Sequence, residues 1–336
     1  MAVTRTAGAA LVGAVFYGGV RVYWNAGHFP GRMSPVGPDL VTISGWGSVA
    51  LCLAAALAVA ATGTRLPRPL VVAAGWGTAA ALAGAAAMLL LDVVGGVLPG
   101  LGIAFYPVGA LSRAACAAAA VLVARTTLLY QRRTRPGRRL LAPLERTPGW
   151  AYVAAYAAMG GCLTRIGAQA WVGFDETPLA SGVSAALFEA GFLLGGTLLP
   201  AALVHRFGRV WPRRVPGAAG RRVPRPLVLW PGAAISAGLV VYFGVMTVQM
   251  VGERLRGRNP FPPGDGLDLP ETFFWIAVPG YLLWGLGMAV AAFAYARTSA
   301  PGERGVSAAT TPDRRRAPVN AEDGRRTRPP GRPAAR

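Results

Sequence analysis

Apolar positions dominate this chain in eight long segments, each about as long as a membrane-crossing helix. The segments cover residues 7–24, 40–62, 70–92, 105–126, 149–171, 183–205, 227–250 and 273–296. A helix of about 20 residues crosses a hydrocarbon core of about 30 Å. Because lipid offers no partner to backbone N–H and C=O groups, such segments must be helical. The pattern therefore predicts an all-α polytopic membrane helix bundle with eight transmembrane helices.

The eight segments divide into two sets of four. Residues 65–71 (RLPRPLV) enter the third segment, and the similar residues 222–228 (RVPRPLV) enter the seventh. Four is an even number, so both sets enter the membrane in the same direction, and we expect two parallel four-helix repeats.

Composition between the segments sets the predicted boundaries. We expect repeat 1 over residues 1–130, a basic cytoplasmic linker over 131–148 and repeat 2 over 149–299. Residues 300–336 are rich in Pro, Gly, Arg and Ala with almost no large apolar side chain. Such a composition cannot bury enough apolar surface to fold, so we expect a disordered basic tail.

The charge of the chain follows the predicted membrane topology. Hydrophobic residues make up 53% and charged residues 14% of the 336 residues, and the formal net charge is +20. Soluble domains contain about one quarter charged residues. Most of the Arg lie before the first segment, after the even-numbered segments and in the tail. The positive-inside rule then predicts a protein of the cytoplasmic membrane with both termini in the cytoplasm.

The distribution of arginine along the chain also indicates which binding partners to expect. Because the positive charge is explained by topology, we expect a lipid bilayer as the surroundings and no nucleic-acid partner. For the basic tail, contact with anionic lipid and simple solvation both stay open.

Five ionisable residues fall within the apolar segments, all in the predicted outer half of the membrane. They are Arg21, Asp92, Arg113, Arg165 and Glu189. Charges at this depth cost several kcal/mol, about 2.5–3.5 at the bilayer centre, and are candidates for function. One hypothesis is an outward-opening polar cavity at the repeat interface, with Arg21 and Arg165 binding a carboxylate or phosphate. The alternative is that Arg21–Asp92 and Arg165–Glu189 are internal ion pairs that only fix packing.

Signals of catalysis and metal binding are absent from the sequence. His28 follows the first segment on the predicted outer side and His205 ends the sixth on the predicted inner side, a bilayer apart. Cys52, Cys116 and Cys162 lack the spacing of a disulfide framework or a zinc site. HExxH, GxSxG and Walker A motifs are missing. We therefore expect no cofactor and no metal, and the sequence favours a protein that is not an enzyme.

Residues 20–27 (VRVYWNAG), at the end of the first segment, carry a resemblance. They resemble bacterial multi-pass integral membrane proteins of unknown activity, which have a basic residue before a Tyr-Trp pair at the end of the first span. Asn25 stands where those proteins would have a small apolar residue. The resemblance implies a membrane protein and transfers no catalytic residue.

Binding or transport of a small anionic or amphiphilic ligand through the outward-facing cavity is the function that these features favour. A non-catalytic membrane scaffold or accessory subunit of an unknown membrane protein is the first alternative. A lipid-linked glycosyl or phosphoryl transferase is the second, and it would need an exposed carboxylate. The candidates for that carboxylate are Asp175, Glu176, Asp265 and Asp268.

Overall fold

The protein is almost entirely helical over the residues that the computed structural model describes. These are residues 2–34, 39–40, 42–135, 144–173, 183–215, 217, 219–261 and 269–298. The description contains helices and an isolated antiparallel bridge between Val210 and Arg222, but no named strand. The all-α prediction is therefore confirmed for this part of the chain. The predicted tail, residues 300–336, lies outside it, as does much of the linker.

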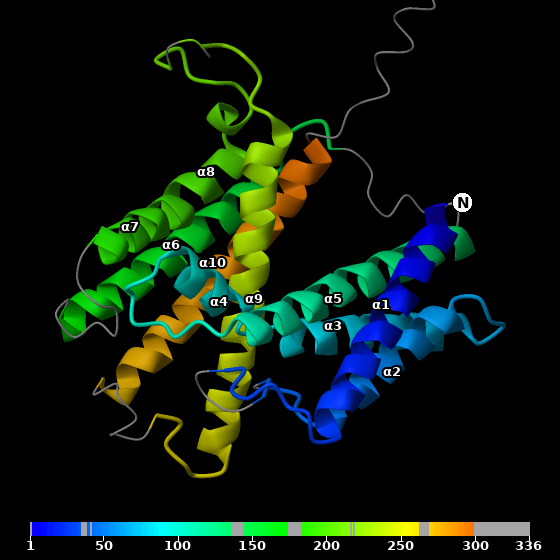
Figure 1. Ribbon diagram of the computed structural model, residues 1–336. Helices are drawn as coiled ribbons and strands as arrows, with labels where there is room; N and C mark the ends of the chain where they lie inside the picture. Colours follow the sequence, from blue (N-terminus) through cyan, green and yellow to red (C-terminus); the bar gives the residue numbers. More distant parts are fainter. Residues whose placement is uncertain are drawn as a thin grey trace, which may run out of the picture. The chain divides into compact units, whose positions relative to one another are not determined.

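Five helices make up the first half of the structure. They are α1 (Ala2–Asn25), α2 (Trp46–Ala61), α3 (Arg68–Ala85), α4 (Leu89–Val97) and α5 (Pro107–Thr134). Both α1 and α3 pack against α2 and α5 (Figure 1). The buried core between them is rich in alanine, including Ala10, Ala55, Ala79 and Ala120. Side chains this small let helix backbones approach closely, which is how helices associate in membranes.

The second half has the same arrangement of neighbours. It comprises α6 (Gly149–Val172), α7 (Val183–Leu193), the π-helical turn η1 (Leu194–Leu198), α8 (Leu199–Val204), the short 3-10 helix η2 (Arg206–Gly208), α9 (Arg225–Leu255) and α10 (Glu271–Thr298). Both α6 and α9 pack against α8 and α10, and Figure 1 shows α6 beside α10. Gly161 of α6 lies against the backbone of α10, where a Cβ atom would overlap the Gly280 carbonyl and sit 2.7 Å from the Trp284 nitrogen.

Each predicted apolar segment contains helix, with three differences in detail. The second segment begins as a helix only at Trp46, not at residue 40. The third is divided at residues 86–88 into α3 and α4, and the sixth contains the π-helical turn. The hydroxyl of Thr42 donates a hydrogen bond to the carbonyl of Gly84 at 2.9 Å, close to the division of the third segment. Thr42 thus adds a hydrogen bond beside a break in the helix that the apolar pattern does not reveal.

Within the described part of the chain, five helical segments are long and apolar enough to cross a membrane. They are Arg68–Val97, Pro107–Thr134, Val183–Val204, Arg225–Leu255 and Glu271–Thr298. α2 is apolar but has only 16 residues, and α1 and α6 are not among the five. The set fits a multi-pass integral membrane protein, whereas eight crossings and two repeats stay predictions.

The two similar RLPRPLV and RVPRPLV sequences start helices in the same way. α3 follows Pro67 with φ −54° and ψ 127°, and α9 follows Pro224 with φ −56° and ψ 122°. Each helix then has a second proline in its first turn, where the missing N–H costs no intrahelical hydrogen bond. Equal local sequences therefore give equal local structure in the two halves.

Candidate functional site

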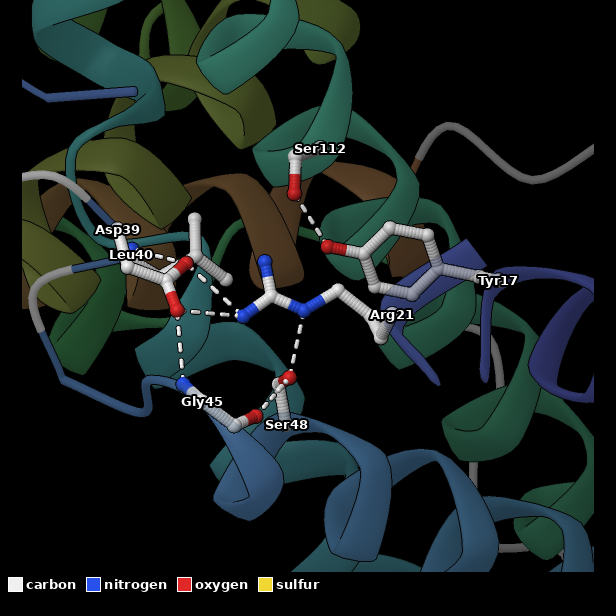
Figure 2. A network of polar contacts seen from close by, with 7 residues as sticks. All are labelled: Tyr17, Arg21, Asp39, Leu40, Gly45, Ser48 and Ser112. Carbon is white, nitrogen blue, oxygen red and sulfur yellow. Dashed lines mark hydrogen bonds and ion pairs between the residues drawn. The ribbon is translucent and has the colours of Figure 1, made fainter. Parts of the chain in front are cut away.

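Arg21 lies at the centre of a buried polar network at the end of α1 (Figure 2). Its Nη2 donates to both carboxylate oxygens of Asp39, at 2.9 and 2.7 Å. Its Nε donates to the Ser48 hydroxyl at 2.5 Å. Ser48 in turn donates to the Gly45 carbonyl, which joins the network to the start of α2. The charge of Arg21 is thus neutralised and enclosed.

Asp39 is the residue that organises this network. Besides Arg21, it accepts hydrogen bonds from the backbone N–H groups of Leu40 and Gly45, both at 2.7 Å. Burial alone would raise the pKa of Asp39, but the hydrogen bonds from Arg21, Gly45 and Leu40 outweigh burial and hold that pKa below its ordinary value. A carboxylate held by donors in this way stays ionised and fixes the chain between α1 and α2.

Arg113 and Asp92 form a second enclosed pair, between α5 and α4. Arg113 Nε and Nη2 donate to the two oxygens of Asp92 at 2.5 and 2.7 Å, and Nη2 also donates to the Met33 carbonyl at 3.0 Å. Both side chains are buried. Two parallel bonds of this kind are the strong, geometrically specific form of an Arg–carboxylate contact.

The predicted Arg21–Asp92 pair is therefore wrong. Asp92 lies in the first turn of α4 and meets Arg113 of α5, while Arg21 meets the loop that follows its own helix. Asp39 is missed by the sequence analysis because it precedes the predicted second segment by one residue. An acidic residue next to an apolar segment, within reach of an intramembrane Arg, is the signal that would have found it.

Arg165 of α6 has a different environment. The predicted contact with Glu189 of α7 forms, but Nη1 and Oε1 are 3.7 Å apart and no hydrogen bond joins them. The Arg165 side chain is 9% exposed and that of Glu189 is 42% exposed. The guanidinium carbon instead lies 4.7 Å from the ring centre of Phe192 and 5.9 Å from that of Tyr281. Aromatic faces attract a guanidinium group but do not neutralise it.

Aromatic rings extend from Arg165 into the core of the second half. Phe192 meets Trp284 edge to face at 4.8 Å, and Tyr281 stacks on Phe243 at 4.0 Å. The indole N–H of Trp284 is buried without an acceptor among the described residues. The π-helical turn η1 begins two residues after Phe192. Such turns occur often at functional sites. The surroundings of Arg165 are therefore apolar, aromatic and irregular.

The five candidate residues, together with Asp39, form three separate ion pairs. A groove of about 440 Å³ does lie between α3, α4, α5 and α9, but its lining is apolar and includes none of the five. Its walls include Leu90, Val121, Ile235 and Val241. The outward-opening polar cavity stays a prediction.

Other candidate chemistry is sparse in the described part of the chain. Cys52, Cys116 and Cys162 are buried and free. The residues that the structure describes contain no group of three or more His, Cys, Asp or Glu that could hold a metal ion. Asp175, Glu176, Asp265 and Asp268, the carboxylates considered for a transferase, lie outside the described residues.

Comparison with protein-family models, curated proteins and solved structures finds no match for this chain. Function is therefore inferred from the geometry of the three arginine–carboxylate pairs.

Proposed function

We propose that this chain is an integral membrane protein that binds a small anionic or amphiphilic molecule at Arg165. The observation that carries the proposal is the difference between Arg165 and the other two arginines. Arg21 and Arg113 each donate hydrogen bonds to both oxygens of an aspartate. Arg165 has one carboxylate oxygen at 3.7 Å, from a side chain that is itself partly exposed.

A ligand carboxylate or phosphate has a clear advantage over Glu189 at this position. It can accept two parallel hydrogen bonds from the guanidinium group, which the single long contact does not provide. The guanidinium carbon lies 4.7 Å from the ring centre of Phe192 and 5.9 Å from that of Tyr281, and neither ring neutralises its charge. The neighbouring rings suit an apolar part of the same molecule, so an amphiphile with an anionic head is the preferred ligand class.

The proposal includes an orientation and a number of crossings. Eight crossings, as two parallel four-helix repeats in the cytoplasmic membrane, place both termini in the cytoplasm and Arg165 in the outer half of the bilayer. A ligand then enters from the outside, for binding alone or as the first step of transport. A scaffold or accessory role is favoured by a different observation, the two enclosed pairs that fix the first half.

Native mass spectrometry of the purified protein tests the proposal. Wild type is compared with Arg165→Gln, Glu189→Gln and the control Thr164→Val, which alters an exposed neighbour whose hydroxyl bonds only its own helix. We expect a bound molecule that Arg165→Gln retains about tenfold less, since a charge-assisted bidentate contact is lost. Glu189→Gln removes the competing carboxylate and increases retention, and Thr164→Val changes nothing. Equal adducts in all four proteins, or an empty wild type, favour the scaffold instead.

A further inference from the structure

A second group of cations, at the other end of the second half, has no acidic partner among the residues that the structure describes. Residues 205–225, which connect α8 to α9, contain seven Arg and no Asp or Glu. The part that the structure describes is an ordered hairpin, which we call the Arg hairpin. The backbone N–H of Trp211 donates to the Arg221 carbonyl at 2.9 Å, and the backbone N–H of Val223 donates to the Arg209 carbonyl at 2.9 Å. This segment is therefore a fixed structure and not only a source of cytoplasmic charge.

Two arginines of the Arg hairpin are turned onto the end of α10. Arg209 Nη2 donates to the hydroxyls of Thr147 and Thr298, at 2.7 and 2.9 Å. Arg225 Nη2 donates to the Ala296 carbonyl at 2.8 Å. The guanidinium carbon of Arg209 lies 5.8 Å from the ring centre of Tyr295, whose hydroxyl donates to the Gly208 carbonyl at 3.0 Å. The two cations thus lie around the same turn of α10.

Neutral acceptors use only a small part of what these side chains offer. A guanidinium group has five N–H donors. Only Nη2 has a protein acceptor in either residue, and the Nε of both is buried without one among the residues described. Neither residue takes part in an ion pair within that part of the chain. Two neighbouring cations with unused donors are stabilised by an anion.

The position of the Arg hairpin indicates which anion. Trp150, at the start of α6, is exposed, and Trp211 of the hairpin is half-buried against the core. Tryptophan gathers at the boundary between hydrocarbon and water, where the phosphates of lipid headgroups lie. Basic pockets between membrane helices at this boundary bind anionic headgroups.

We infer that Arg209 and Arg225 form a phosphate-binding site at the end of α10, occupied by the phosphate of an anionic lipid. The site is separate from that proposed at Arg165, because Arg165 lies about 24 Å along α6 from Gly149, at a rise of 1.5 Å per residue. Failure of one proposal therefore leaves the other standing.

The experiment is a native mass spectrometry titration of the full chain in detergent with phosphatidylglycerol, and with phosphatidylcholine for comparison. The test variant is Arg209→Gln/Arg225→Gln. The matched control is Arg213→Gln/Arg214→Gln, which removes the same charge from exposed arginines of the same hairpin. We expect tighter binding of phosphatidylglycerol than of phosphatidylcholine, about tenfold weaker binding in the test variant, and a change below about threefold in the control. Equal weakening in the two variants, or no preference between the lipids, overturns the site.

Two further measurements complete the test. Inorganic phosphate added at millimolar concentration shows the source of the ligand: displacement of the lipid indicates that free phosphate fits the site, and retention indicates that the lipid is required. Should the test variant fail to fold, hydrogen exchange of the wild type decides the matter. Phosphatidylglycerol is expected to slow exchange at residues 209–211 and 220–223, and unchanged exchange there contradicts the inference.

Discussion

Each of the three arginines Arg21, Arg113 and Arg165 is defined by the carboxylate that it meets. Asp39 accepts two hydrogen bonds from Arg21, and Asp92 accepts two from Arg113. Ser48 and Met33 provide further acceptors. Removing one partner of such a pair leaves an uncompensated buried charge and costs about 3–5 kcal/mol. Arg165 has only a long contact to a partly exposed glutamate. Two of the three arginines are therefore hydrogen-bonded to their carboxylates, and the third is not.

Asp39 gives the first prediction. Because the pKa of Asp39 is lower in the folded protein than in the unfolded chain, its pairing stabilises the fold above the unfolded value of about 4. That stabilisation is lost as the pH falls through the lower, folded pKa. Thermal denaturation of wild type should show a constant Tm from pH 7 to about 5 and a fall below about pH 4.

Asp39→Asn is the matched control for that measurement. It keeps the shape of the side chain but cannot neutralise Arg21, so its Tm at neutral pH should be lower than that of wild type, with a smaller fall in acid. Parallel pH curves for the two proteins would show that Asp39 does not stabilise the fold through its charge.

At the scale of the helix, close approach depends on glycine at particular positions. Gly161 has the backbone of α10 directly against it, whereas the neighbouring Gly160 has nothing within 4 Å of where a Cβ would be. Gly196 of η1 is likewise closed in by the Cys162 side chain. Since small residues allow membrane helices to pack, the contact of α6 with α10 depends on the face that Gly161 occupies.

Gly161→Ala against Gly160→Ala tests this contact. We expect Gly161→Ala to destabilise the protein by about 1–3 kcal/mol, because the added methyl overlaps backbone that cannot move aside. Gly160→Ala adds the same methyl on the open side and should be neutral or stabilising by up to about 1 kcal/mol, from helix propensity. Equal melting temperatures for the two variants would contradict the packing of α6 on α10.

The helices were predictable from sequence. The breaks within them, and most of the residues that contact the candidate arginines, were not. Apolar segments of about 20 residues predict helices because lipid permits little else. The division of the third segment at residues 86–88 lies inside an unbroken apolar run, and hydroxyls from distant Thr42 and Ser34 donate to Gly84 and Met88 beside it. The partner of Arg21 is set by the path of the loop after α1. Phe192 and Tyr281 look like ordinary core residues in the sequence, and only the packing of α7 and α10 brings them to Arg165.

At the scale of the whole molecule, the number of membrane crossings separates two arrangements. Five crossings, by the five segments Arg68–Val97, Pro107–Thr134, Val183–Val204, Arg225–Leu255 and Glu271–Thr298, place residues 64 and 256 on the same side of the membrane, because four of these segments lie between them. Eight crossings place five segments between these positions, and so put them on opposite sides.

Cysteine labelling distinguishes the arrangements. Thr64→Cys and Arg256→Cys are made singly in a protein whose three natural cysteines are replaced by alanine. With a membrane-impermeant maleimide on intact cells, we expect labelling at position 256 and not at position 64. Labelling of both, or of neither, would contradict eight crossings.

The most direct test of the account compares three variants side by side: Arg21→Lys, Arg113→Lys and Arg165→Lys. Lysine keeps the charge but cannot form two parallel hydrogen bonds with a carboxylate. Thermal denaturation of the purified proteins should show clearly lower Tm values for two variants: Arg113→Lys, which loses the two parallel hydrogen bonds to Asp92, and Arg21→Lys, which loses the separate Nε and Nη2 donors to Ser48 and Asp39. Little change is expected for Arg165→Lys. A loss of stability at Arg165 as large as at the other two would contradict the claim that Arg165 is available to a ligand.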